Sequence, residues 1–505
     1  MNARHDALTR FAGLTITLLA IATAVPAAFA QESESDNPAK FRREIDESYT
    51  VRPQAWIDVT HREGQLDLEG WDRDQVQVIA TIEAAGPRAL ELGAQIRVQV
   101  DNNGGQLRVR TVYPTEERDE TSFDVHLTVK MPRSHPVRVA NSFGSTSVRS
   151  VGRGLDVESA NGNVKVGDVR GQVNVKATFG DIEIGGVQGE TRITGRTTNL
   201  KLAEVQGRQH WIENSFGDTN VLGLTGNAQV RVGNGKLAMN GATGDMHIEA
   251  TYVESDLEKV RGSITFRGNN SVVGLSGVRG NVRIDNSHGD ISLEGAVGDA
   301  HLAVHTGSVS LSEIGGAVNG NFDFAQVRMN GVRGETHVQG QNSTFVIEDA
   351  AEKLTVRNSF GAIEVSGVRR STHLHNQSGD IRLRNVNLEL KDKRAAQPGH
   401  RGPWGDQIDC RTTFGLVEIE LPSVPSMRLN ATATFGDIES DIVLPGRVER
   451  GTTTQCQGMI GDDPRDTRID ATIMLHSENG SIRIGKPAPE KAEEGEPKAK
   501  KPEMN

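Results

Sequence analysis

The 505-residue sequence is poor in aromatic residues, and it lacks the short motifs that mark common catalytic sites. Phe, Trp and Tyr make up 4% of the chain, so aromatic side chains to stack on sugars in an enzyme cleft are scarce. No HExxH, GxSxG, P-loop or dinucleotide-binding pattern is present. The sequence therefore predicts a non-enzymatic protein with no catalytic residues and no cofactor.

Cysteine is scarce, and basic residues are outnumbered by acidic residues. There are 56 Lys and Arg against 67 Asp and Glu, and this net charge of −11 argues against nucleic acid as a partner and gives no attraction to anionic lipid. The two cysteines, Cys410 and Cys456, both lie in the C-terminal part. An oxidising compartment would let them pair, so we predict a disulfide, with two free thiols as the alternative.

Only one hydrophobic run is long enough to matter for targeting, at residues 11–25. Two arginines precede it and the small-residue site Ala-Phe-Ala follows, which is typical of a secretory signal peptide. We expect residues 1–30 to be cleaved and residues 31–40 to form a flexible lead. The product would have no transmembrane segment and would be periplasmic or extracellular. A non-cleaved anchor is the alternative, and the absence of a cysteine after the site argues against a lipoprotein.

Glycine, in contrast, is abundant at 56 of 505 residues and recurs at a fixed interval. A glycine closes a Val-x-Gly turn every 18 residues, with one interval of 19 between Gly207 and Gly226. This column contains Gly171, Gly189, Gly207, Gly226, Gly244, Gly262, Gly280, Gly298, Gly316 and Gly334, and continues as Glu352 and Arg370. A second column, half a repeat away, contains Gly180, Gly217, Gly235, Gly289, Gly307, Gly361 and Gly379.

A fixed period of this kind predicts a solenoid whose units stack to bury a shared core. Between the turns, apolar and polar residues alternate, as at Val173 and Val175 and then at Ile182 and Ile184. This alternation predicts two strands in each repeat. The expected fold is therefore all-β, a parallel β-solenoid (β-helix) of 18-residue repeats with β-rich N- and C-terminal caps.

The residue before the second turn glycine alternates between a ring and a small polar residue. In order, these residues are Phe143, Asn161, Phe179, Thr197, Phe216, Asn234, Tyr252, Asn270, His288, Thr306, Phe324, Asn342, Phe360 and Ser378. Either a ring fills the space of two rungs in an 18-residue coil, or the true coil has 36 residues. The pattern favours 18 residues and leaves the longer coil open.

The segments on either side of the repeats are expected to close the two ends. Residues 41–140 contain strands without the 18-residue period and should form an antiparallel cap, because a bare solenoid end exposes unpaired strand edges. Residues 141–384 form the solenoid, and residues 408–485 form a C-terminal β cap. Residues 486–505, rich in Pro, Lys and Glu, are expected to be disordered.

The insertion at residues 385–407 is the largest break in the period and is the first candidate for a binding loop. Its candidate residues are Lys391, Lys393, Arg394, His400, Arg401 and Trp404. An aromatic residue flanked by cations suits an anionic glycan or a protein anchor pocket. A disordered excursion is the alternative.

Arginines recur in the Val-x-Gly turns. They are Arg170, Arg261, Arg279, Arg333 and Arg369. This turn ladder favours a solvated edge that keeps the stack soluble, and contact with an anionic glycan is the functional alternative.

Five histidines lie three residues after a turn glycine and are expected to point outward. They are His210, His247, His301, His337 and His373. In an 18-residue coil, the last three lie two rungs apart, about 9 to 10 Å, which is too far to share one metal ion. We expect these histidines to form a solvated face with no metal site. Their side chains could titrate together near neutral pH.

Four aspartates follow glycines of the second column. They are Asp181, Asp218, Asp290 and Asp380. A calcium-binding β-roll is one interpretation, but its Gly-Gly-x-Gly-x-Asp run is absent, so turn chemistry is preferred.

Three features together resemble a known family. They are the strand ending in Glu69-Gly-Trp-Asp72, the Met131-Pro132 step, and the recurrent Asn-Ser-Phe-Gly and Phe-Gly-Asp-Ile turns. The chain between about residues 56 and 485 resembles the bacterial putative-adhesin family, also called toastrack domains. The resemblance implies an envelope-located, non-enzymatic β-helix linked to adhesion or envelope-stress sensing, and it supplies no catalytic residues.

These features leave three candidate functions. An adhesin-like module that binds a cell-surface glycan or an envelope protein is preferred, and a structural or sensory envelope protein with a membrane partner is the alternative. A polysaccharide-cutting β-helix enzyme is disfavoured, because the rungs from residue 154 to 370 lack insertions that would build cleft walls.

Overall fold

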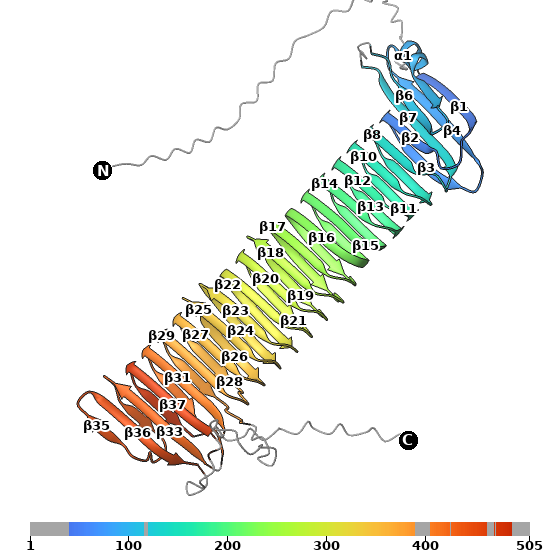
Figure 1. Cartoon of the computed structure of the whole chain (residues 1–505). Helices are drawn as coiled ribbons and strands as arrows, with labels where there is room; N and C mark the ends of the chain where they lie inside the picture. Colours follow the sequence, from blue (N-terminus) through green and yellow to red (C-terminus); the bar gives the residue numbers. More distant parts are fainter. Residues whose placement is uncertain are drawn as a thin grey trace, which may run out of the picture.

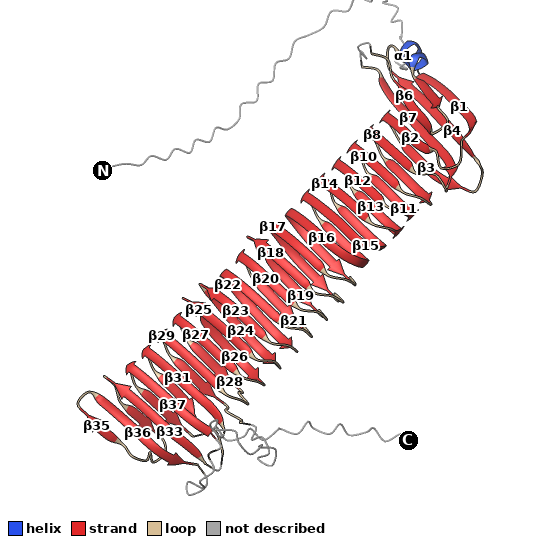
Figure 2. Ribbon diagram, viewed as in Figure 1, coloured by secondary structure: helices blue, strands red, loops and turns tan. Residues whose placement is uncertain are grey.

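The structure, a computed structural model, describes residues 40–115, 120–388, 405–424, 426–461, 469 and 471–486. They form a long, straight rod of stacked strands with one short helix at the N-terminal end (Figure 1). The predicted all-β parallel solenoid is confirmed, with about 14 turns of about 18 residues. Strand dominates the rod along its whole length (Figure 2). The predicted signal peptide, the lead up to residue 39 and the tail from residue 487 lie outside the described residues.

Seven strands and one helix build the N-terminal end. They are β1 (Lys40–Thr50), β2 (Trp56–Glu63), β3 (Leu66–Trp71), β4 (Gln75–Ala85), α1 (Ala89–Gln95), β5 (Arg97–Asn102), β6 (Gln106–Val112) and β7 (Ser122–Pro132). Within the described ranges, no helix is long and apolar enough to span a membrane.

The regular rod follows. It consists of β8 (Val137–Phe143), β9 (Thr146–Val151), β10 (Leu155–Asn161), β11 (Val164–Arg170), β12 (Val173–Phe179), β13 (Ile182–Gln188), β14 (Thr191–Thr197), β15 (Leu200–Phe216), β16 (Thr219–Asn240), β17 (Met246–Glu258), β18 (Ile264–Asn269), β19 (Val272–Ser276), β20 (Val282–His288), β21 (Ile291–Glu294), β22 (Ala300–Ile314), β23 (Val318–Asp323), β24 (Ala325–Val332), β25 (Thr336–Gln341), β26 (Thr344–Ala350), β27 (Leu354–Phe360), β28 (Ile363–Ser366), β29 (Thr372–Ser378) and β30 (Ile381–Arg384).

The C-terminal end contains the last eight strands. They are β31 (Asp406–Phe414), β32 (Val417–Glu420), β33 (Met427–Thr434), β34 (Ile438–Ser440), β35 (Val448–Arg450), β36 (Thr453–Ile460), β37 (Ala471–Asn479) and β38 (Ile482–Gly485).

One coil of the rod takes 18 residues, so the 36-residue alternative is wrong. Val173 pairs in parallel with Leu155 on one side and with Thr191 on the other. The turn glycines stack on adjacent rungs: a Cβ built on Gly189 would lie 1.9 Å from the carbonyl oxygen of Gly171. Glycine is needed there because the turns of neighbouring rungs approach so closely. In the second column, Gly180 has the same close approach, with 2.5 Å from a built Cβ to the carbonyl oxygen of Gly162, and its φ of 105° also favours glycine.

The interior of each coil is a continuous apolar stack. Val173 and Val175 on one strand face Ile182, Ile184 and Val187 on the next, and all five are buried. Each of them lies above an equivalent apolar or small residue of the previous rung, so the core runs unbroken along the rod.

A third corner, which the sequence interpretation missed, lies between the two glycine columns. Its residue has a left-handed backbone in rung after rung, with φ of 62° at Gly186, 68° at Gly223 and 54° at Glu204. The glycines at several of these positions could have indicated this third corner from the sequence, but non-glycine residues interrupt the column.

Buried asparagines explain the Asn-Ser-Phe-Gly turns. The side-chain amide of Asn358 donates to the carbonyl oxygens of Ser343 at 2.7 Å and Phe360 at 2.9 Å. Asn286 makes the equivalent contacts with Ser271 at 2.8 Å and His288 at 3.1 Å. Each asparagine thus fixes the turn that carries a ring, and it satisfies backbone carbonyls that burial would otherwise leave unpaired.

The N-terminal end differs in part from the expected antiparallel cap. β1, β4 and β7 form an antiparallel sheet, and β5 pairs antiparallel with β6. However, β2 and β3 stack in parallel on β8 and β9, so they already form a solenoid coil. The 18-residue period of the sequence does not reveal this coil, because Ile57 of β2 pairs with Val137 of β8, which is distant in the sequence.

The C-terminal coils stack out of chain order. β37 lies between β31 and β33, and β38 lies between β32 and β34. β36 then pairs antiparallel with β33, and the short, exposed β35 pairs with β36. A short edge strand of this kind limits edge-to-edge association.

The predicted disulfide is wrong, because Cys410 and Cys456 are both free and buried. Cys410 pairs with Leu475, Leu475 with Ala431, and Ala431 with Cys456. Three strand spacings of about 4.8 Å separate the cysteines, about 14 Å in total. A disulfide needs Cα atoms within about 7 Å. Burial raises the pKa of both thiols, which makes them unreactive.

Ile182 is assigned to the core and Glu183 to the exposed face, so substitutions at these adjacent positions should lower the free energy of unfolding by different amounts. Ile182→Ala should lower the free energy of unfolding by about 2 to 5 kcal/mol, because it opens a cavity in the stack. Glu183→Gln removes only an exposed ion pair with Lys165 and should change it by less than about 0.5 kcal/mol. Urea unfolding followed by circular dichroism measures both, and equal shifts for the two variants would contradict the assignment.

Candidate functional surfaces

The predicted binding loop cannot be placed. Its candidate residues Lys391, Lys393, Arg394, His400, Arg401 and Trp404 lie outside the described residues. The two ends of the insertion are fixed to the rod. Val386 is buried, and the carboxylate of Asp406 accepts a hydrogen bond from the backbone amide of Ser371 at 3.0 Å.

The turn arginines share one exposed corner but do not form a continuous ladder. Arg261 and Arg279 lie on adjacent rungs. Five rungs separate Arg170 from Arg261, and the positions between them include Gln188, Gln206, Thr225 and Thr243. Three rungs separate Arg279 from Arg333, and two separate Arg333 from Arg369. Of these five arginines, only Arg261 and Arg279 lie on adjacent rungs, so only there do two positive charges lie close together.

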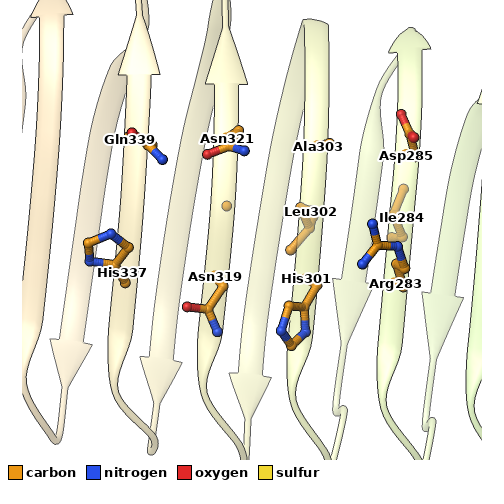
Figure 3. Close-up of a pocket in the computed structure, with 11 residues that line it drawn as sticks. Arg283, Ile284, Asp285, His301, Leu302, Ala303, Asn319, Asn321, His337 and Gln339 are labelled. Atoms are coloured by element: carbon orange, nitrogen blue, oxygen red, sulfur yellow. The ribbon is translucent and has the colours of Figure 1, made fainter.

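Four of the five histidines point outward, as expected. His301 and His337 lie two rungs apart on one face, with Asn319 on the strand between them (Figure 3). They border a shallow polar hollow of 260 Å³ that also includes Arg283 and Asp285. His373 lies two rungs beyond His337 on the same face. At about 9.6 Å, two strand spacings, the rings are too far apart to bind one metal ion. Among the described residues, no group of three potential ligands is arranged to hold a metal.

His210 is the exception, and its predicted outward orientation is wrong. The ring is fully buried, with Nδ1 2.9 Å from the Thr191 hydroxyl and Nε2 3.0 Å from the Thr225 carbonyl oxygen. The pairing of β15 with β16 shifts by one residue between Gln206 and Gln209, which is a β-bulge. The extra residue of the 19-residue interval lies here, so the third residue after Gly207 takes the inward position of Thr191, and Trp211 takes the outward position of Arg192.

The turn aspartates satisfy backbone groups of the next rung. Asp290 accepts a hydrogen bond from the amide of Ser308 at 2.9 Å, Asp218 from Lys236 at 3.0 Å, and Asp380 from Leu416 at 3.0 Å. Asp181 accepts from the side chain of Asn199 at 2.9 Å. Three of these contacts are to backbone amides and agree with the turn chemistry preferred from the sequence, and the contact of Asp181 is to a side chain.

A row of exposed rings along one corner is the most unusual surface feature. The ring positions stack in register with the small polar residues between them, as Asn161, Phe179 and Thr197 do. The rings neither fill the core nor lie flat against it. Their exposed fractions range from 47% at Phe360 to 69% at Phe435. In the described part of the chain, every exposed Phe or Tyr belongs to this ring row, which comprises Phe143, Phe179, Phe216, Tyr252, His288, Phe324, Phe360, Phe414 and Phe435.

The alternation of the ring row continues where the chain order changes. Ser378 stacks on Phe414, and Phe414 stacks on Asn479 of β37. Phe435 follows β33, which is the next strand in space, so a small residue again separates two rings. The order ring, small residue, ring is therefore a property of the assembled rod rather than of the sequence repeat.

A second buried histidine, His61 in β2, was not singled out from the sequence. Its ring nitrogens lie 3.1 Å from the Thr111 hydroxyl and 3.0 Å from the Val125 carbonyl oxygen. Burial lowers the pKa of His61 to about 4. An unfolded histidine has a pKa near about 6.5, so the folded state binds fewer protons between these values.

We predict that stability falls as the pH drops from about 6.5 toward 4, because protonation of His61 favours unfolding. His61→Gln should flatten the dependence of the unfolding free energy on pH over this window. The exposed His301→Gln serves as the control and should leave the slope unchanged. A His61→Gln slope equal to that of the parent protein would contradict the assignment.

Comparison with known proteins identifies the family. The sequence model described as Toastrack DUF4097 matches residues 57–271 and 262–484. A solved structure of a putative cell adhesion protein from Clostridium sporogenes shares 7% sequence identity, covering 88% of this chain and 100% of that chain, with a TM-score of 0.14. Comparison with curated proteins gives no match. Because the family model spans most of the rod, the chain belongs to the Toastrack DUF4097 family.

Proposed function

We propose that this protein is an exported, non-catalytic binding module of the cell envelope that makes adhesive contacts through the ring row. The observation that carries the proposal is the gathering of exposed Phe and Tyr rings on one corner of a chain with few aromatic residues. Exposed apolar side chains reduce solubility, and their concentration in one place is a common mark of a contact surface.

The rigid stack makes the ring row suitable for binding. Each ring is held by a turn whose backbone is paired with both neighbouring rungs, as at Phe179. A preorganised surface loses little conformational entropy when it binds. A partner that reaches several rings at once therefore gains affinity from each contact.

Export is supported by the sequence of residues 1–30, with its apolar run and small-residue cleavage site. A periplasmic or cell-surface location would put the ring row in contact with envelope polymers. The family assignment agrees with a non-enzymatic role.

A pull-down of the mature chain, residues 31–505, on isolated bacterial cell envelopes tests this proposal. The double variant Phe179→Asn/Phe216→Asn replaces two rings by the residue found at the neighbouring Asn161 rung. Its matched control, Leu222→Asn/Val297→Asn, removes two equally exposed apolar side chains elsewhere on the rod. We expect the ring variant to lose most of its binding while the control retains it.

Equal retention of the ring variant and the control would overturn the proposal, provided that circular dichroism shows both to be folded. Attention would then move to the insertion at residues 385–407 and to the adjacent pair Arg261 and Arg279.

A further inference from the structure

We propose that the ring row binds a neutral, extended β-1,4-linked glycan that lies parallel to the rod axis, with one ring stacked on every second sugar. This inference rests on the proposed function and deepens it, because it names the chemistry of the partner and its orientation.

The spacing of the rings carries the argument. Neighbouring rings, such as Phe179 and Phe216, are separated by two rungs, about 9.6 Å at one strand spacing of about 4.8 Å. In a β-1,4-linked glycan, each sugar is turned over relative to the one before it. The same sugar face therefore recurs once per disaccharide, and the length of a disaccharide is close to two strand spacings. An extended peptide repeats its side chains on one face at only about 6.6 to 6.8 Å, so it does not match.

The residues beside the rings suit a polymer covered with hydroxyl groups. At eight of the nine ring rungs, the preceding residue carries a hydroxyl and is half-buried or exposed. These residues are Ser142, Thr178, Ser215, Thr251, Ser287, Ser359, Thr413 and Thr434, and Asp323 is the exception. A hydroxyl next to an aromatic face provides hydrogen bonds and stacking together, which a sugar needs and a purely apolar partner does not.

A groove runs beside the first three rings, on the other side of the turns. Its volume is 610 Å³, and Asn163, Asp181, Asn199 and Asp218 line it on four consecutive rungs. Lys165 and Glu183 form part of its outer wall. The groove thus places further hydrogen-bonding groups along the rod axis, in the direction that the glycan would take.

The charge along this corner favours a neutral polymer. Asp181, Asp218 and Asp437 lie two residues from a ring, and the net charge of the chain is −11. The carboxylates beside Phe179 and Phe216 disfavour an anionic polymer there, whereas an uncharged glycan is not repelled by them.

Three rings also occupy backbone conformations that an aromatic residue rarely adopts. Tyr252, Phe324 and Phe435 have φ of 56°, 49° and 56°. Asparagine tolerates this left-handed region far better, and Asn234, Asn270 and Asn342 adopt it on neighbouring rungs. Rings at these sites are maintained at a cost in stability, which is expected of a surface kept for binding.

The test measures binding of the mature protein to defined glycans by isothermal titration calorimetry. The probes are chitohexaose and cellohexaose, with the corresponding disaccharides to test length. Laminarihexaose, which is β-1,3-linked and has a different repeat, is the linkage control. Insoluble chitin and purified peptidoglycan sacculi then distinguish a neutral homopolymer from the cell-wall glycan, whose peptide stems carry carboxylates and which the charge beside the rings disfavours.

We expect a β-1,4 hexasaccharide to bind at least roughly tenfold more tightly than its disaccharide, because it reaches several rings. Phe179→Asn/Phe216→Asn leaves six consecutive rings from Tyr252 onward, so it should lower the number of hexasaccharides bound per chain, and Leu222→Asn/Val297→Asn should not. Tyr252→Asn/Phe324→Asn should weaken binding and also leave the melting temperature unchanged or raise it, which separates a binding role from a folding role.

Binding that depends neither on length nor on the rings, or that is equally strong for laminarihexaose, would overturn the inference. If envelope binding depends on the rings while no β-1,4 glycan binds, the glycan inference fails and the proposed function stands. If the parent protein sediments as a dimer and the ring variant as a monomer, the ring row is an interface between two copies of this chain and the inference is wrong.

Discussion

The in-register stacking of one coil on the next is the constraint on which the rest of this structure depends. Parallel strands about 4.8 Å apart place each residue directly above its equivalent in the previous rung. The turns approach so closely that Gly189 has no room for a Cβ against the carbonyl oxygen of Gly171. Residues at the same position of successive coils therefore lie in a column along the rod. The apolar columns form the core, Asn286 and Asn358 fix turns, and Asp218 and Asp290 satisfy amides of the next rung.

Stacking also explains which features could be predicted from the sequence. The interval between Gly171 and Gly189 indicated the coil length, and the alternation at Ile182 and Ile184 indicated the core face, because both depend on local periodicity. The orientation of His210 depends on the place of a bulge inside the 19-residue interval, which no local pattern marks. The separation of Cys410 and Cys456 depends on the insertion of β37 between β31 and β33, a long-range pairing without a sequence signal. The alternation of rings was visible, but their exposure was not.

The ring row shows how a repetitive scaffold can present a selective surface. A column repeated on every rung would place rings about 4.8 Å apart, where they would cover one another. Alternation with small residues such as Asn161 and Thr197 leaves each ring about half exposed. It also doubles the distance between successive rings from one rung to two. The rod therefore presents a fixed spacing, and its length sets how many units of a polymer it can contact. The β1–β4–β7 sheet and the short β35 cap its ends, which limits end-to-end association of rods.

Changing the spacing of the rings without removing any of them tests this account most directly. Duplicating residues 263–280 adds one rung with a small residue in the middle of the row, so Tyr252 and His288 become three rungs apart. Duplicating residues 263–298 adds two rungs and keeps the alternation. Both insertions repeat native rungs and should fold, because each coil contacts only its neighbours. The account predicts that the one-rung insertion weakens binding of long chitin oligosaccharides while the two-rung insertion preserves or strengthens it. Equal binding by the two proteins would contradict it.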